Sequence, residues 1–168
     1  KELEDEEARR AFRTLSEKIQ SFAILHEKLH EVSAVREVDV RSYLTELAES
    51  VMAYEPDDKD IELRISIDPL TVPVDTVVAC GLIVSELIGN ALQHAFEGRA
   101  EGRVDVSFSG GDTCRLRVSD DGVGMPLRDT TRETGGLGIV RSVVDYQLNG
   151  DLEITRNGGT AVTVTFLK

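Results

Sequence analysis

The chain has 168 residues, of which 40% are hydrophobic and 30% charged, with a formal net charge of −12 and a pI near 4.7. This composition predicts one globular core plus a helical arm, and a core of this size needs no disulfide or metal to hold it together. The acidic excess, without a dense run of Lys or Arg, argues against nucleic acid or an anionic membrane surface as a partner.

The cysteines and the hydropathy of the sequence indicate in which cellular compartment the protein works. Cys80 and Cys114 lie far apart in the sequence, each within an apolar run, and form no CxxC pair. We interpret them as reduced core residues of a cytoplasmic protein. No apolar run approaches the roughly 18 residues of a membrane span, and no signal peptide precedes the first helix, so we expect no direct membrane contact. The start at Lys1, without Met, predicts a fragment of a longer protein.

Residues 1–38 are predicted to form a helical arm. Between Leu3 and Val35 one set of positions alternates spacings of four and three, as in the seam of a helix that packs on partner helices. The set is Ala8, Phe12, Leu15, Ile19, Phe22, His26, Leu29 and Ser33. A single helix cannot hide such a seam, so the arm predicts a homodimer or a bundle.

His26 on this seam has two interpretations. It could accept a phosphoryl group, because Glu27 follows it. It could instead be a packed seam histidine with a satisfied hydrogen bond. We favour the packed histidine, because a nucleophilic imidazole must be reachable by a phosphoryl donor.

Residues 39–168 are predicted to form the second domain, which begins with a helix from Asp39, its cap, to Tyr54. Alternating apolar residues then predict a strand over 61–67. A longer helix follows from Asp75, a second predicted cap, to Phe96. Its apolar positions recur at helical spacing and are Val78, Leu82, Val84, Leu87, Ile88, Ala91, Leu92 and Ala95.

Two hairpins and one more helix complete the chain. Strands are predicted over 103–109 and 113–119, joined by a Gly-Gly-Asp turn, and over 151–156 and 160–167, joined by Asn-Gly-Gly. A helix is predicted from about Leu137 to Leu148. The fold class is therefore α+β, a two-layer sandwich with helices on one face of a mixed, mostly antiparallel sheet, preceded by the arm.

A polar stripe interrupts the long apolar helix. Glu86, Asn90 and His94 stand four residues apart and so share one side of the helix. The stripe is either a solvated face or the wall of a ligand site, because burying these groups without partners costs roughly 1–3 kcal/mol for each neutral group.

The first glycine-bearing loop, 119–126, leaves a strand without entering a hairpin. Asp120 can accept a hydrogen bond from an exocyclic amine, and Gly122 and Gly124 lack a Cβ, so a flat ring can lie against their backbone. An ordinary turn is the alternative interpretation.

The second glycine-bearing loop, 134–140, opens into a helix and includes Gly135, Gly136, Leu137 and Gly138. Consecutive backbone N–H groups at such a helix start suit phosphates. The loop matches neither the P-loop pattern nor the dinucleotide fingerprint.

Taken together, these segments resemble the N, G1 and G2 boxes of the ATP-binding domain of sensor histidine kinases. The matching motifs are Glu86-x-x-x-Asn90-x-x-x-His94, Asp120-x-Gly122-x-Gly124 and Gly135-Gly136-Leu137-Gly138. That fold is shared with gyrase-type topoisomerases, MutL-type repair ATPases and heat-shock chaperones, and the resemblance covers about Asp60 to Lys168. The segment 19–29 is similar to the second helix of the dimerisation and phosphotransfer region in the subfamily whose first helix carries a His-His-Arg-Val-Lys-Asn-Asn type motif. That motif is absent from this chain.

The resemblance implies ATP and Mg²⁺ as ligands. Asn90 would be the protein ligand of Mg²⁺, and Glu86 the catalytic residue that orients the attacking imidazole or accepts its proton. His94 would donate a hydrogen bond to the phosphates. Asp120 would read the adenine amino group with support from the hydroxyl of Thr160. Gly135, Gly136 and the helix start at Leu137 would hold the phosphates.

In two respects the chain departs from the wider family. The segment between Gly124 and Gly135 is short and lacks Phe, which leaves Arg128 and Arg132 as the candidates for phosphate contacts there. Asp121 stands where Asn is common, and we expect little effect because that side chain need not face the base.

Three functions remain open at this point. The leading one is the catalytic part of a histidine autokinase, whose acceptor histidine is missing from this fragment and which passes the phosphoryl group to an aspartate of a response regulator. The second is a nucleotide-binding switch without kinase activity, which would not need Glu86. The third is an anti-sigma-type serine kinase or another ATPase of the same fold.

Overall fold

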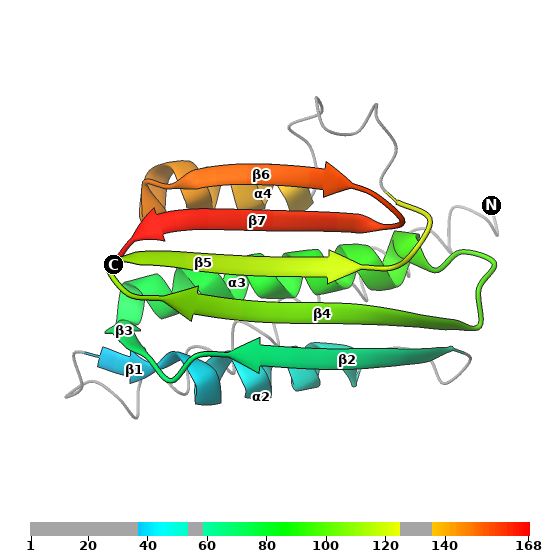
Figure 1. Cartoon of the computed structure of the whole chain (residues 1–168), viewed down its shortest axis with the longest axis horizontal. Helices are drawn as coiled ribbons and strands as arrows, with labels where there is room; N and C mark the ends of the chain where they lie inside the picture. The colour runs from blue at the N-terminus through cyan, green and yellow to red at the C-terminus, as the bar shows by residue number, and fades with distance from the viewer. Residues whose placement is uncertain (1–36, 54–58, 125–135) are drawn as a thin grey trace, which may run out of the picture. The chain divides into compact units, whose positions relative to one another are not determined.

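A five-stranded β-sheet forms the core in a computed structural model that describes residues 37–53, 59–124 and 136–168 (Figure 1). Its strands are β2 (Asp60–Ile67), β4 (Glu101–Gly110), β5 (Thr113–Asp120), β6 (Asp151–Arg156) and β7 (Thr160–Leu167). The strand order is β2-β4-β5-β7-β6. β2 and β4 are parallel, and the other neighbours are antiparallel. The mostly antiparallel sheet of the sequence prediction is therefore confirmed.

The helices cover one face of this sheet, as predicted. They are α2 (Val40–Met52), α3 (Val74–Asn90) with a π-helical turn η1 (Ala91–Ala95), and α4 (Gly136–Val143) with a second π-helical turn η3 (Val144–Leu148). Figure 1 shows them behind the sheet. Alternate residues of the strands point toward the helices and are buried, among them Val104, Val106, Phe108, Leu116 and Val164. This layer between sheet and helices is the hydrophobic core.

Both predicted hairpins are confirmed. In the first, Phe108 of β4 lies opposite Leu116 of β5. In the second, Ile154 of β6 lies opposite Val162 of β7. Gly158 and Gly159 in the second turn have positive φ angles of 68° and 134°, which glycine adopts at the lowest cost.

α2 begins as predicted. The Asp39 carboxylate accepts hydrogen bonds from the backbone N–H groups of Arg41 at 3.2 Å and Ser42 at 3.3 Å. These are two of the donors that the first turn of a helix leaves unsatisfied. The helix ends at Met52, and Tyr54 lies outside the described residues.

α3 begins differently from the prediction, because Asp75 is not its cap. The helix starts at Val74 with Pro73 at the N-cap position, and no side chain caps it. The reason is a small two-stranded sheet, which three-residue strands made invisible in the sequence. β1 (Glu37–Asp39) pairs with β3 (Thr71–Pro73) and holds the chain extended up to Pro73. Asp75 lies in the first helical turn instead.

The expectation that no apolar stretch reaches membrane-spanning length is also wrong. Residues Val74–Ala95, 22 in all, are long and apolar enough by length and composition to cross a membrane. Gly, Ala and Cys between the larger residues obscured the length of this stretch. Over half of it, 56%, is buried inside the structure, as expected for a core helix.

α3 is buried on more sides than one amphipathic face. Val78 and Leu82 from the predicted apolar set are half-buried, whereas Val77 and Ile83 are fully buried. The helix lies between its neighbours α2 and α4 in the helical layer and also packs on the sheet.

Cys80 and Cys114 are both buried and form no disulfide, in agreement with their interpretation as core residues. Burial raises the pKa of the Cys80 thiol from 9.0 to about 12. Cys80 is therefore a neutral thiol at physiological pH and packs as a small apolar side chain.

Candidate functional site

Asp120, the last residue of β5, is held in place by one of its two carboxylate oxygens. Oδ1 accepts hydrogen bonds from the backbone N–H groups of Gly122 at 2.9 Å and Thr160 at 3.2 Å. Oδ2 has no hydrogen-bond partner among the described residues. The side chain is therefore fixed in position and keeps one acceptor for a ligand.

Gly159 allows the β6–β7 turn to approach Asp120 closely. A Cβ at Gly159 would lie 2.0 Å from the backbone oxygen of Asp120, so no other residue fits without a shift. The sequence prediction missed Gly159 as part of the site. The Gly158-Gly159 pair was visible there, but it served only to predict the turn.

The loop after β5 is packed against the end of the long helix. Val123 N–H donates to the backbone oxygen of Ala95 at 2.9 Å, and a Cβ at Gly122 would lie 2.2 Å from that same oxygen. Gly122 is thus required for this contact, independently of any room that it leaves for a ring. Gly124 has a positive φ of 79°.

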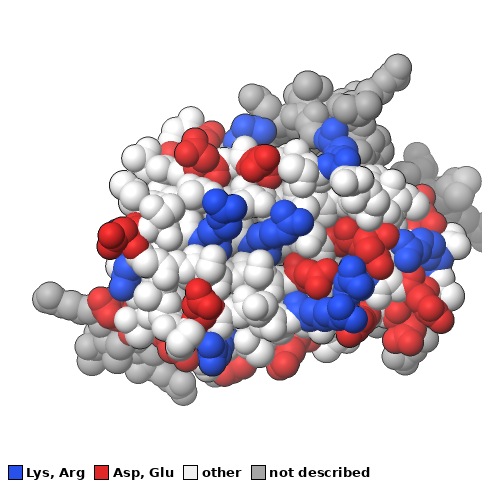
Figure 2. Space-filling model, viewed as in Figure 1, with Lys and Arg blue, Asp and Glu red and all other residues white. Residues whose placement is uncertain are grey.

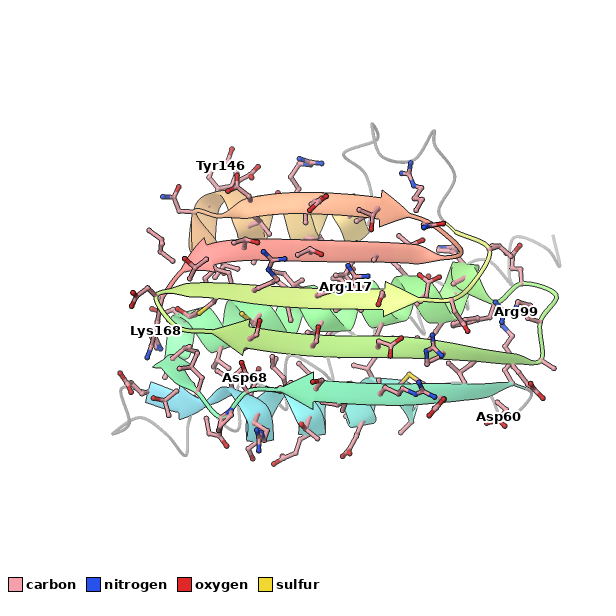
Figure 3. The ribbon with its side chains drawn as sticks, viewed as in Figure 1. Asp60, Asp68, Arg99, Arg117, Tyr146 and Lys168 are labelled. Atoms are coloured by element: carbon pink, nitrogen blue, oxygen red, sulfur yellow. The ribbon has the colours of Figure 1, made fainter. Side chains whose placement is uncertain are left out.

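The Asp121 side chain is engaged away from Asp120. Its Oδ1 accepts from the backbone N–H of Arg103 at 2.9 Å. Arg99 donates to the backbone oxygen of Asp121, and its guanidinium lies 5.9 Å from the centre of the Phe96 ring. Figure 3 shows Arg99 beyond the ends of the strands, where it borders this loop. These contacts support the expectation that Asp121 does not face a bound base.

Glu86 and Asn90 lie against the first residue of α4. A Cβ at Gly136 would lie 2.5 Å from Glu86 Oε2 and 3.1 Å from both side-chain polar atoms of Asn90. The two helices can meet at this point because residue 136 is a glycine. Glu86 is 6% exposed and Asn90 is half-buried, so the carboxylate is largely shielded from water.

His94 is the third residue of the predicted polar stripe. It is exposed and lies within η1, where the helix widens from the α to the π hydrogen-bond pattern. The wider turn changes the angle between His94 and Asn90 from the one that α-helical spacing predicts. The structure thus brings Glu86 and Asn90 together with Gly136, and among the described residues no hydrogen bond joins His94 to them.

The start of α4 follows the second glycine-bearing loop. Gly136 opens the helix, and Leu137 and Gly138 are half-buried in its first turn. Backbone N–H groups in a first turn have no partner within the helix. Gly135, Arg128 and Arg132, which were also predicted to contact phosphates, lie outside the described residues.

Contacts connect the site residues that the structure describes, from Asp120 through the loop after β5 and Ala95 to Asn90 and Gly136. Figure 1 shows the end of β5, the end of α3 and the start of α4 on the same side of the molecule. The residues gathered there from separate elements are Glu86, Asn90, Asp120, Gly122, Gly136 and Thr160. A ligand bound at this end would meet a fixed acceptor, an amide, a shielded carboxylate and a helix start.

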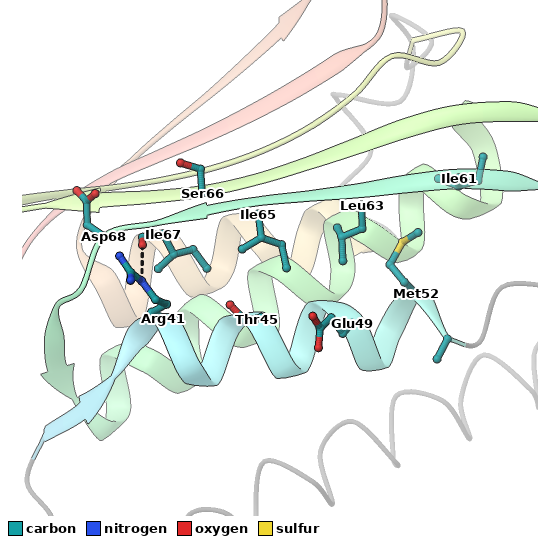
Figure 4. Close-up of a pocket in the computed structure, with 11 residues that line it drawn as sticks. Arg41, Thr45, Glu49, Met52, Ile61, Leu63, Ile65, Ser66, Ile67 and Asp68 are labelled. Carbon is teal, nitrogen blue, oxygen red and sulfur yellow. Dashed lines mark hydrogen bonds between the residues drawn. The ribbon is translucent and has the colours of Figure 1, made fainter.

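A separate hollow of about 1000 Å³ lies between α2 and the edge strand β2. Figure 4 shows Ile61, Leu63 and Ile65 of β2 on one side and Thr45 and Glu49 of α2 on the other. The hollow contains none of the predicted site residues. The outer face of the sheet carries interspersed acidic and basic side chains (Figure 2).

Comparison with known proteins agrees with this geometry. Residues 75–168 match the model of the histidine kinase-, DNA gyrase B- and HSP90-like ATPase family, and residues 1–54 match a histidine kinase family model. Blue-light-activated histidine kinase 2 of Erythrobacter litoralis is 34% identical over 162 residues, which are 91% of this chain and 46% of that protein. Sensor histidine kinase PdtaS of Mycolicibacterium smegmatis is 27% identical over 95% of this chain and 33% of its own length. The chain thus spans about half or less of these curated relatives.

A solved structure is also similar. The histidine kinase domain from the Erythrobacter litoralis EL346 blue-light-activated histidine kinase superposes with a TM-score of 0.80 at 32% sequence identity, over 91% of this chain and 74% of that one. The shared fold and the matches that span both parts of the sequence lead to one assignment. The chain belongs to the family of histidine kinase-, DNA gyrase B- and HSP90-like ATPases and, within it, to the sensor histidine kinases.

Proposed function

We propose that this chain is the catalytic part of a sensor histidine kinase that binds Mg²⁺–ATP and transfers its γ-phosphoryl group to a histidine outside the printed sequence. A response-regulator aspartate would then receive the group. One observation carries the proposal: Asp120 is bonded to Thr160, the loop after Asp120 contacts Ala95, and the helix that runs up to Ala95 carries Glu86 and Asn90, which lie against Gly136.

The base of the nucleotide is assigned to Asp120. An ionised carboxylate only accepts hydrogen bonds, so Oδ2 would pair with the 6-amino group of adenine. Thr160 supports this contact because its backbone N–H holds Oδ1. Gly124, whose φ of 79° suits glycine, continues the loop beside the base.

The phosphates are assigned to the start of α4 and the end of α3. The first-turn N–H groups at Gly136, Leu137 and Gly138, with Gly135 before them, suit phosphate oxygens. Mg²⁺ takes oxygen ligands, usually one or two protein groups together with phosphates and waters, and the amide of Asn90 at the Gly136 contact fits that requirement. When bound, the ion would neutralise charge on the transferred group. His94 would approach the phosphates from η1.

Glu86 is assigned to the proton that the acceptor imidazole loses. As the bond from the acceptor nitrogen to the γ-phosphorus forms, the bond from that phosphorus to the β,γ-bridging oxygen breaks, and ADP leaves. The imidazole proton passes to the Glu86 carboxylate, which is nearly buried and lies one turn before Asn90.

The serine-kinase alternative has weaker support. Serine-protein kinase RsbW of Listeria innocua is 33% identical, but the match covers 79 residues and 46% of this chain. The histidine kinase relatives match over nine-tenths of the chain, including the arm that is expected to dimerise. We place the protein in the cytoplasm on the same basis.

Variants of the α3 residues test the function. Asn90→Ala should abolish Mg²⁺-dependent ATP binding in calorimetry, because it removes the proposed metal ligand. Glu86→Gln should bind ATP nearly as the wild type does and, in the parent protein, slow phosphoryl transfer, because the carboxylate acts in the transition state. Normal binding by both variants together with an unchanged transfer rate would contradict the assignment.

Labelling with γ-labelled ATP separates the alternatives. This chain alone should retain no acid-labile, base-stable label, because its acceptor lies elsewhere. Label that His26→Ala removes would instead identify His26, which lies outside the described residues, as the acceptor. Acid-stable label on an added protein substrate would favour the serine-kinase alternative.

A further inference from the structure

Arg156 is a charged residue whose surroundings the proposed function does not explain. Its Nε and Nη2 atoms are buried, and neither has a hydrogen-bond partner. Burying a polar donor without a partner typically costs 1–3 kcal/mol, and more for a charged group. Buried polar groups are usually paired, so this exception requires an explanation.

Two other arginines, Arg64 and Arg103, have ion-pair partners and can be compared with Arg156. Arg64 pairs with Glu62 at 2.9 Å at an exposed position, and the half-buried Arg103 pairs with Asp105 at 3.0 Å. Arg156 is also half-buried, but it has no ion pair among the described residues. Two buried donors of its side chain are therefore left without an acceptor, although the protein has an excess of acidic residues.

The sheet register places Arg156 in line with the base-reading residues. Arg156 ends β6 directly opposite Thr160 of β7, so the two side chains are on the same face of the sheet. Thr160 in turn is bonded through its N–H to Asp120 on β5. The three residues thus form a row across three adjacent strands. With neighbouring strands about 4.8 Å apart, Arg156 and Asp120 are separated by roughly 10 Å of backbone, about the width of a purine with its sugar.

We propose that Arg156 contacts the base and ribose end of the bound adenine nucleotide and donates hydrogen bonds to its ring nitrogens or sugar oxygens. This inference rests on the proposed function. The register favours this end over the phosphates, because Asn90 and Gly136, which are assigned to the phosphates and Mg²⁺, come from α3 and α4. An adenosine molecule offers the same acceptors without any phosphate, which makes the two ends separable by experiment.

The experiment measures the dissociation constants of adenosine and ADP by calorimetry for the wild type, Arg156→Met and Arg117→Met. Arg117→Met is the matched control, because Arg117 is an exposed arginine of β5 in the same sheet (Figure 3). Arg156→Met should weaken adenosine and ADP by the same factor, roughly 10-fold or more, as expected for loss of a charged hydrogen bond. Arg117→Met should bind both as the wild type does.

Two results would overturn the inference while the proposed function stands. Equal binding of both ligands by wild type and Arg156→Met would show that Arg156 does not contact the nucleotide. Weakening of ADP without weakening of adenosine would assign Arg156 to the phosphates. If the wild type binds neither ligand, the proposed function itself fails.

A further variant, Arg156→Lys, distinguishes loss of a nucleotide contact from a folding defect in Arg156→Met. Lysine keeps the charge but lacks the planar fork of donors, so this variant should bind both ligands with an affinity between those of wild type and Arg156→Met. A lower melting temperature in Arg156→Lys with unchanged affinity for both ligands would show a structural role and contradict the proposal.

Discussion

At Asp120 the two oxygens of one carboxylate have different tasks. Oδ1 joins the loop at Gly122 to the strand at Thr160, and Oδ2 faces the proposed base. The first task needs an acceptor, which an amide also provides. The second depends on charge, because an amide can donate as well as accept. Substitution by Asn therefore separates the structural task from the selective one.

Asp120→Asn should reduce the preference for ATP over GTP. Guanine carries a carbonyl oxygen where adenine has its amino group, so a carboxylate would face a second acceptor. Leaving such a contact unpaired costs about 1–3 kcal/mol, roughly 5- to 150-fold in affinity, and the wild type should prefer ATP by that margin. Competition binding of ATP against GTP measures it. Asp121→Asn is the control, because Asp121 is bonded to Arg103 instead. Equal wild-type affinities for the two nucleotides would make the loop at Asp120 an ordinary turn.

At the scale of elements, the two long helices start by different means. The side chain of Asp39 caps α2, whereas α3 follows a strand and has no side-chain cap. Asp39 should therefore contribute more to stability than Asp75 does, although the sequence predicted a capping role for both.

Asp39→Ala should lower the free energy of unfolding by about 1 kcal/mol, within the 0.5–2 kcal/mol typical of lost caps. Asp75→Ala should lower it by a few tenths of a kcal/mol, because Asp75 lies in the first turn of α3, where a carboxylate interacts favourably with the helix dipole. Urea unfolding of both variants compares the two. Equal losses would contradict the difference between the helix starts.

Elements with a local sequence pattern could be predicted, whereas pairings between residues far apart in the sequence could not. Alternation and the two glycine turns are local signals, so β2, β4, β5, β6 and β7 were predicted nearly to their ends. β1 and β3 are too short for any periodicity, and the parallel pairing of β2 with β4 is a long-range contact that no local pattern encodes. The π-helical turns were missed because their residues also suit an α-helix.

The site was predictable as a set of motifs, and its geometry was not. The order of Glu86, Asn90, Asp120 and Gly136 along the chain was sufficient for the family resemblance. The close approach of Gly159 to Asp120 could not be predicted from the sequence, because it arises between two hairpins.

For the molecule as a whole, the buried side chains of Cys80, Cys114 and Tyr43 make the free energy of unfolding depend on pH. Burial raises the pKa of Cys80 from 9.0 to about 12, and burial also raises the pKa of Cys114 and of Tyr43. In the unfolded chain Cys80 loses its proton near pH 9, whereas the folded chain keeps it. The contribution of such a group to stability is therefore complete below pH 9 and is lost as the pH rises toward 12.

The free energy of unfolding should accordingly fall above pH 9, by at most about 1.4 kcal/mol per pH unit for each such group. Cys80→Ala should make this fall shallower without abolishing it, because Cys114 and Tyr43 contribute in the same direction. Urea unfolding at several pH values between 7 and 10.5 measures the slope. The same slope in wild type and variant would contradict the role of Cys80.

The register between β5 and β7 has a consequence for the order of folding. Each hairpin closes a turn of two or three residues, whereas Asp120 and Thr160 are 40 residues apart in the sequence. Short loops close at a lower entropic cost than long ones, so the hairpins are favoured as early structures and their pairing as a later one. A partly folded chain that has formed only its hairpins would then have no place for an adenine ring, and nucleotide would stabilise the finished domain without guiding the steps that build it.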